Sequence, residues 1–181
     1  VRADHLSLCG YERPTSPTLE SLRDRGAVWT CDAYAPGSWT LPTHASFFTG
    51  LPVTTHGMHT FAQSEEEAGE EGSAWVPTTL TQGVFPLPRN RETLAQTLGA
   101  RGYRTAAFSG NPTVSRELEL TRGFDEAYAA RAFVAGNGDK LLERIHGVLP
   151  RWKDQGGSRF LFVNFADAHN PWPAVPEGVD W

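Results

Sequence analysis

One apolar run near the C-terminal end of the sequence most narrows the folds open to this chain. Residues 159–165 read RFLFVNF, and such a nearly continuous run of large apolar side chains is typical of a strand covered on both faces. Strands of that kind occur in parallel sheets that carry helices on either side. The segments 27–35 and 103–109 are also predicted to be strands, the first with only partial alternation.

Four further segments have helical patterns, and they are residues 18–25, 40–49, 91–101 and 139–152. In the last of them, Leu142, Ile145 and Leu149 are predicted to lie on one face of the helix. Pro150 is expected to end that helix early, because proline lacks an N–H and clashes with the preceding turn.

The long stretch 51–90 is predicted to be irregular, because it is rich in Pro, Gly and Thr. It contains the acidic run 65–71, EEEAGEE. That run is interpreted as a solvated loop, since its spacing does not favour a cation site.

The alternation of helices and strands predicts an α/β fold, a three-layer sandwich whose mostly parallel central sheet has helices on both faces. In such sheets, ligands bind beyond the carboxyl ends of the strands. Thr40 and His44 follow the first predicted strand. Asp167 and His169 follow the last one. The order predicts that these four side chains face one crevice.

Composition argues against several classes of function. The net charge of −5 over 181 residues disfavours a nucleic-acid partner, for which a basic footprint is expected. No segment approaches the ~20 apolar residues of a membrane span, and no signal peptide is visible. Cys9 and Cys31 have no metal-ligand spacing, and a buried thiol for each is favoured over a bond between them. The compartment stays open, with a lean towards the cytoplasm.

The stretch 38–50, SWTLPTHASFFTG, admits two interpretations. Thr40 stands where a hydroxyl would cap a short helix, and Gly50 stands where that helix would end. Alternatively, Thr40 presents its oxygen to an anion at the positive N-terminal end of the helix. The local pattern alone favours the cap, because hydroxyl caps are far commoner than hydroxyl nucleophiles.

Five stretches, in this order, resemble the sulfatase-like branch of the alkaline phosphatase superfamily, and they are VRADHLSLCGYERPTSPTLESLRDRGAVW, APGSWTLPTHASFFTGLPVTTHGMH, RETLAQTLGARGYRTAAFSGNP, TRGFDEAY and FLFVNFADAHNPWP. The resemblance implies an alkaline-phosphatase-like three-layer sandwich. It also implies that residues 1–181 are the N-terminal part of a sulfatase-like catalytic domain that is incomplete at both ends.

The resemblance also assigns roles to single residues. Thr40 takes the position of the nucleophile, and a threonine there argues against the cleavage of sulfate esters through formylglycine. His44 replaces the family's Arg. His169 resembles a histidine that contacts the transferring group or protonates the leaving oxygen, the alternative being a histidine that closes a loop. Asn111 falls near the position where sulfatases have an anion-binding Lys, and it is the expected substrate-binding residue. The alternative is that it forms an Asn-Pro turn. His56 is expected to be structural.

These assignments imply a metal-dependent hydrolase or phosphotransferase that acts on phosphate or sulfate esters through a threonine nucleophile. The expected cofactor is a divalent ion (Zn, Mn, Ca or Mg), bound by Thr40 and by ligands outside this chain, so the 181-residue chain alone is expected to be inactive. The expected substrate is a small-molecule, glycan or lipid ester. The alternative is a non-catalytic sulfatase-like fold that serves as a binding or scaffolding module.

Overall fold

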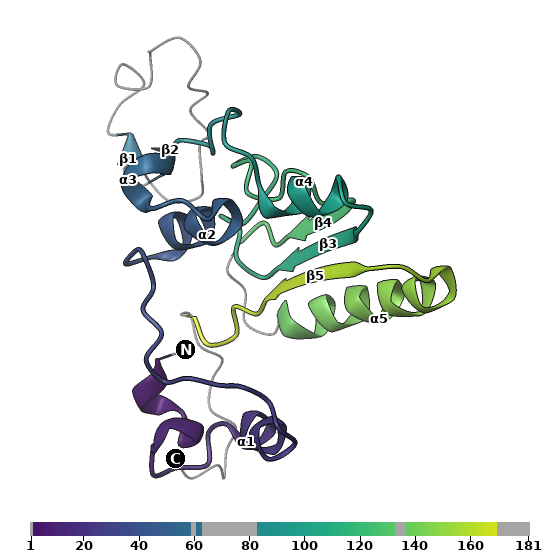
Figure 1. The fold of residues 1–181 in the computed structure, drawn as a ribbon. Helices are drawn as coiled ribbons and strands as arrows, with labels where there is room; N and C mark the ends of the chain where they lie inside the picture. Colours follow the sequence, from purple (N-terminus) through teal and green to yellow (C-terminus); the bar gives the residue numbers. More distant parts are fainter. Residues whose placement is uncertain (1, 59–60, 63–82, 133–136, 170–181) are drawn as a thin grey trace. The chain divides into compact units, whose positions relative to one another are not determined.

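The computed structural model describes residues 2–58, 61–62, 83–132 and 137–169 (Figure 1). The chain divides into two compact units, residues 1–35 and 36–181. The acidic run 65–71 lies outside the described residues. Among the described helices, none combines the length and the apolar composition that a membrane crossing requires.

The first unit is built from two 3₁₀ turns and one helix, which are η1 (Ala3–His5), η2 (Ser7–Cys9) and α1 (Pro17–Asp24). Helix α1 confirms the helix predicted over 18–25. Cys9 and Cys31 form a disulfide with a Cα–Cα distance of 5.9 Å, so the expectation of two separate thiols is wrong. Ser16 is the one buried side chain among the described residues of this unit. The unit is therefore held by its disulfide and by polar contacts rather than by an apolar core.

The strand predicted over 27–35 is not formed. A strand needs a neighbouring strand to satisfy its backbone groups, and in the described chain this segment pairs with none. Its apolar side chains are not buried either, since Val28 is fully exposed and Tyr34 is 92% exposed. The partial alternation of the segment therefore does not mark a core-facing strand.

The second unit contains a three-stranded sheet of β3 (Arg104–Ser109), β4 (Glu126–Ala129) and β5 (Arg159–Asn164) in the order β4-β3-β5. Both pairings are parallel, with Ala106 opposite Glu126 on one side of β3 and opposite Leu161 on the other. The strands predicted from the apolar runs 103–109 and 159–165 are confirmed. The central place in the described sheet belongs to β3.

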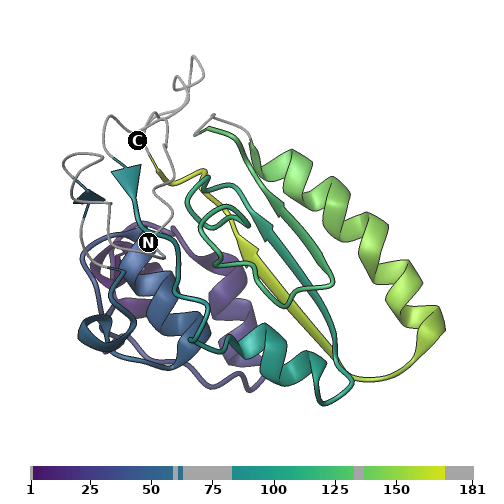
Figure 2. The same ribbon diagram turned by 90° about the horizontal axis from the view of Figure 1, so that it is seen from above.

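Helices cover both faces of this sheet, which confirms the three-layer α/β fold (Figure 2). Helices α2 (Thr40–Thr49) and α4 (Leu94–Gly99) pack on the face that carries Ala107 and Phe162. Helix α5 (Asn137–Gln155) packs on the other face. The core of the first face includes Leu41, Phe48, Leu87, Val114, Leu118 and Leu120, and that of the second includes Ala106, Phe108, Leu141, Val148 and Trp152.

Helix α4 begins at Leu94, three residues later than the predicted start at Arg91. Thr93 and Gln96 form a capping box, in which each side chain bonds the other residue's backbone N–H. A capping box fixes the first turn of a helix. The prediction gave the right helix and missed this cap.

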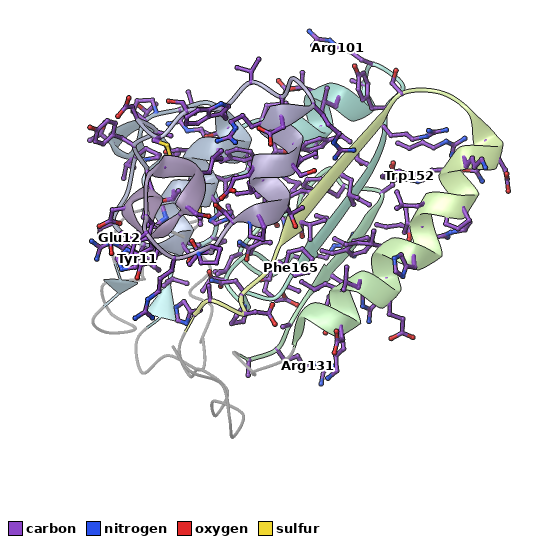
Figure 3. The ribbon with its side chains drawn as sticks, turned by 90° about the horizontal axis from the view of Figure 1, so that it is seen from below. Tyr11, Glu12, Arg101, Arg131, Trp152 and Phe165 are labelled. Atoms are coloured by element: carbon purple, nitrogen blue, oxygen red, sulfur yellow. A yellow bond between two sulfur atoms is a disulfide. The ribbon has the colours of Figure 1, made fainter. Side chains whose placement is uncertain are left out.

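Helix α5 runs through Pro150 to Gln155, so the early end predicted at the proline is wrong. Pro150 lies on the exposed side of the helix, where water can bond the carbonyl that the proline leaves unpaired. The apolar face predicted from Leu142, Ile145 and Leu149 is not the buried one, since Leu142 is 42% and Leu149 is 45% exposed. The buried stripe is Leu141, Val148 and Trp152, with Ile145 partly buried beside them. Trp152 is labelled in Figure 3.

Among the described residues of the stretch predicted to be irregular, there are three short elements. They are α3 (Val53–His56) and the antiparallel pair of β1 (Phe61–Ala62) and β2 (Gly83–Val84). Phe61 pairs with Val84. This pairing brings the chain back from residue 62 to residue 83 beside α3 and α2 (Figure 1).

Candidate functional site

Thr40 is the first residue of α2, and Trp39 occupies the cap position before it. The structure gives no side-chain cap at this helix end, so the Thr40 hydroxyl does not serve as an N-cap. The turn before the helix packs tightly, because a Cβ on Gly37 would lie 2.8 Å from Pro42 Cγ. Thr43 Oγ1 donates to the Gly37 carbonyl at 3.0 Å. These contacts fix the backbone that presents the half-buried Thr40.

The Thr40 hydroxyl accepts a hydrogen bond from Asn111, whose Nδ2 lies 3.0 Å from Thr40 Oγ1. The orientation of the Asn111 amide follows from Thr113, because the backbone N–H and the hydroxyl of Thr113 both lie against Asn111 Oδ1, at 2.9 and 2.7 Å. An N–H can only donate, so Oδ1 is the acceptor and Nδ2 is the group that faces Thr40. Asn111 itself is buried.

Asn111 is held by the end of β3 as well as by its own turn. Its backbone N–H donates to Ser109 Oγ at 3.0 Å, and Ser109 Oγ lies 3.2 Å from Asn164 Oδ1 on β5. The turn predicted at Asn-Pro is therefore present, and the same residue also reaches Thr40. Thr113 and Ser109 were missed from the sequence, although an Asn followed two residues later by a backbone donor is a known turn pattern.

His44 lies one turn along α2 from Thr40 and contacts it through the backbone. Its Nδ1 lies 2.8 Å from the Thr40 carbonyl oxygen, which can only accept, so Nδ1 carries the hydrogen. Burial lowers the pKa of the imidazole below its ordinary value of 6.5, and the hydrogen bond to Thr40 opposes that shift in pKa. The ring also packs edge-on against Phe162 at 5.8 Å between centroids. Neutral His44 thus keeps Nε2 as its remaining acceptor.

His169 and Asp167 lie on the turn after β5. The backbone N–H of His169 donates to the Ala166 carbonyl at 2.8 Å, and its side chain is exposed. The turn abuts the one that carries Asn111, since a Cβ on Gly110 would lie 3.1 Å from the Ala166 Cβ. His169 is thus at the same edge of the sheet as Asn111.

Asp167 makes a contact that the sequence did not predict. Its Oδ1 accepts from the backbone N–H of Gly138 at 3.2 Å, in the first turn of α5. A carboxylate there satisfies an otherwise unpaired N–H and interacts favourably with the positive end of the helix. The contacts bring Thr40, His44 and Asn111 together, and a crevice that holds Thr40, His44, Asp167 and His169 stays a prediction.

His56 is structural, as expected. It is buried, its Nδ1 accepts from the backbone N–H of Met58 at 3.1 Å, and its Nε2 lies 2.9 Å from Ser46 Oγ on α2. Both ring nitrogens are therefore engaged within the fold and tie α3 to α2.

The described residues do not by themselves make a metal centre, because they contain no group of three or more His, Cys, Asp or Glu side chains that could hold an ion. Thr40 Oγ1 is the oxygen that accepts the hydrogen bond from Asn111. Two neutral groups approach Thr40, the Asn111 amide at its hydroxyl and the His44 imidazole at its carbonyl. This arrangement can orient the hydroxyl and donate to an oxygen next to it.

Comparison with known proteins places this chain in a family. The family model of the sulfatases matches residues 1–178, which is nearly the whole chain. A comparison with curated proteins gives no match. The match spans both units and every residue of the candidate site. The chain therefore belongs to the sulfatase family, a family of hydrolases.

Proposed function

We propose that this chain supplies the nucleophile of a metal-dependent hydrolase or phosphotransferase that acts on phosphate or sulfate esters through Thr40. The observation that carries the proposal is the hydrogen bond from Asn111 Nδ2 to Thr40 Oγ1. A buried amide of fixed orientation donates this bond to the hydroxyl oxygen. A threonine that only caps a helix would not need such a donor.

Transfer of a phosphoryl or sulfuryl group requires an aligned oxygen nucleophile and stabilisation of the charge that develops during transfer. A hydrogen bond donated to the Thr40 oxygen favours its charged form and so lowers the pKa of the hydroxyl. Asn111 Nδ2 carries a second hydrogen, which can donate to an ester oxygen placed beside Thr40. Asn111 is therefore proposed to bind the substrate as a neutral donor while it orients the nucleophile.

His44 and His169 are the proposed proton-handling groups. Because Nδ1 of His44 is bonded to the Thr40 carbonyl, Nε2 is the atom through which His44 would act. The lowered pKa of His44 keeps it neutral at pH 7, so it would serve as an acceptor. His169, exposed at the same edge of the sheet, is proposed to donate the proton to the leaving oxygen.

Members of the sulfatase family generally use a divalent metal ion. Thr40 Oγ1 is the ligand we propose from this chain, and the remaining ligands are proposed to lie outside it. A bound ion would lower the pKa of the alcohol, which is otherwise a weak nucleophile. On this proposal the 181-residue chain alone has no turnover.

The test is an activity panel on the protein that carries this chain. It compares bis(p-nitrophenyl) phosphate, p-nitrophenyl phosphate and p-nitrophenyl sulfate, each with Mn²⁺, with Zn²⁺ and with EDTA. Metal-dependent release of p-nitrophenol from at least one ester supports the proposal. No release from any ester with either metal would favour the binding or scaffolding module instead.

A further inference from the structure

Strand β5 ends in a polar side chain, Asn164, on the face of the sheet that α2 covers. Side chains of a strand point alternately to its two faces. Phe160 and Phe162 pack in the core beneath α2 and α4, whereas Leu161 packs in the core beneath α5. Asn164 is two residues beyond Phe162 and is the last residue of β5. Its side chain therefore lies on the α2 face, at the carboxyl end of the strand, where ligands of parallel sheets bind.

A continuous series of hydrogen bonds joins Asn164 to the proposed nucleophile. Ser109 Oγ lies 3.2 Å from Asn164 Oδ1, and it accepts from the Asn111 backbone N–H at 3.0 Å. Asn111 Nδ2 in turn donates to Thr40 Oγ1 at 3.0 Å. Ser109 and Asn164 are also paired residues of the neighbouring strands β3 and β5. Asn164 thus stands beside the residues that orient the Thr40 hydroxyl.

The orientation of the Asn164 amide follows from the single hydrogen of the Ser109 hydroxyl. This hydroxyl also lies 3.0 Å from the Asn111 carbonyl oxygen, but that carbonyl already accepts from the Val114 N–H at 3.2 Å. The hydrogen of Ser109 is therefore assigned to Asn164 Oδ1. Nδ2 is then the outer atom of a half-buried amide, and among the described residues it has no hydrogen-bond partner.

An N–H that the fold leaves unused at such a place can donate to a ligand. The transferred group of a phosphate or sulfate ester carries negative charge on its oxygens, and hydrogen bonds to charged acceptors are the stronger kind. Asn111 follows β3 and Asn164 ends β5. The two amides therefore offer donors from neighbouring strands at the same edge of the sheet.

We propose that Asn164 is a second substrate-binding amide, which donates through Nδ2 to an oxygen of the ester group that Thr40 attacks. The proposal rests on the function proposed above for Thr40. Asn111 and Asn164 then bind the oxygens of that group without adding charge to the site. Asn164 acts by its own contact with the substrate, and its bond to Ser109 fixes the direction of that contact.

The test is the binding of inorganic phosphate to the Zn²⁺-loaded protein that carries this chain, measured by isothermal titration calorimetry. Asn164→Asp keeps the oxygen that accepts from Ser109 but has no N–H, and Asn164→Leu lacks both without adding charge. Each variant should bind phosphate at least about tenfold more weakly, because a hydrogen bond to a charged group is lost. Circular dichroism checks that both are folded.

The control is Gln155→Glu, which makes the same change from amide to carboxylate at an exposed residue. Gln155 ends α5 and precedes β5, so it lies at the opposite end of that strand from Asn164. Phosphate binding by this variant should equal that of wild type.

The pattern of losses decides the role of Asn164. A loss in Asn164→Leu alone would show that Asn164 acts only through Ser109, and a loss in Asn164→Asp alone would show an effect of charge. Either result would overturn the proposal, as would unchanged binding by both folded variants or no phosphate binding by wild type. Phosphate binding by wild type without release of p-nitrophenol from any ester would instead overturn the function proposed for Thr40.

Discussion

Asn111 donates a hydrogen bond from its side-chain amide to the Thr40 hydroxyl, and the two residues are 71 positions apart in the chain. One begins α2 and the other follows β3. The contact therefore depends on the packing of α2 over the sheet, and neither local segment contains it. It also disfavours the interpretation of Thr40 as a helix cap, because the hydroxyl is engaged by a distant amide and not by its own helix.

Asn111→Asp tests the donor without removing the turn. An aspartate keeps the oxygen that accepts from Thr113 but has no N–H to donate to Thr40. We expect turnover to fall by about 10²-fold, as for the loss of one donor at a reacting oxygen, while the variant stays folded by circular dichroism. Asn111→Ala should lose both the turn and the donor. Wild-type turnover by Asn111→Asp would show that Asn111 serves the turn alone.

The site is thus only partly readable from the sequence. Thr40 and His44 could be singled out because they stand in one short motif, and Asn111 because its place in the chain resembles that of an anion-binding Lys in the family. The four-residue crevice stays a prediction, and the contact of Asp167 with the N-terminal end of α5 was not foreseen. Which carboxylate caps a helix and which one faces a substrate depends on tertiary packing, which spacing does not encode.

His44 should make the stability of the fold depend on pH. Its folded pKa lies below the ordinary value of 6.5, so the unfolded chain binds the proton more readily. Stability from this group is complete above pH 6.5 and is lost as the pH falls from 6.5 towards the lower folded pKa. Urea unfolding at pH 7.5 and 5.5, in EDTA, should show a smaller loss for His44→Gln than for wild type. An equal loss in both proteins would contradict this account.

Some elements of the fold could be predicted from the sequence and others could not. Strands β3 and β5 were predictable because their apolar runs fit a sheet covered on both sides. The segment 27–35 has similar residues but no partner strand, and sequence alone does not show the partner. In α5, the buried face contains Leu141 and the predicted apolar face contains Leu142. These residues are neighbours in the sequence, so the pattern alone does not show which of the two is buried.

The disulfide should be the main restraint on the first unit. Cys9 and Cys31 are 22 residues apart, and closing a loop of that size stabilises by about 3 kcal/mol. Cys9→Ser/Cys31→Ser should therefore raise amide hydrogen exchange across residues 2–35 and leave β3 protected. Disulfides persist in oxidising compartments, which weighs against the lean towards the cytoplasm. Unchanged exchange in residues 2–35 would show that polar contacts suffice there.

Gly123 should tolerate no side chain, because its backbone has a positive φ of 91° and a Cβ would lie 2.6 Å from the Gln96 backbone nitrogen. Gly102 is the matched control, since it has φ of 80° and no atom near a built Cβ. Gly102→Ala should cost about 1–2 kcal/mol of unfolding free energy. Gly123→Ala should cost about 1–3 kcal/mol more, because the start of α4 must shift. Equal losses in urea unfolding would show that the close approach is harmless.

The measurement that bears most directly on the central claim is the turnover of Thr40→Ala beside Thr40→Ser, in the protein that carries this chain and at saturating metal. Serine keeps the attacking oxygen, so Thr40→Ser should retain measurable turnover. Alanine removes that oxygen, so Thr40→Ala should lose at least about 10³-fold in kcat, as when a nucleophile is removed. Circular dichroism should show both variants folded. Wild-type turnover by Thr40→Ala would contradict the account and leave Thr40 as no more than the residue at which α2 begins.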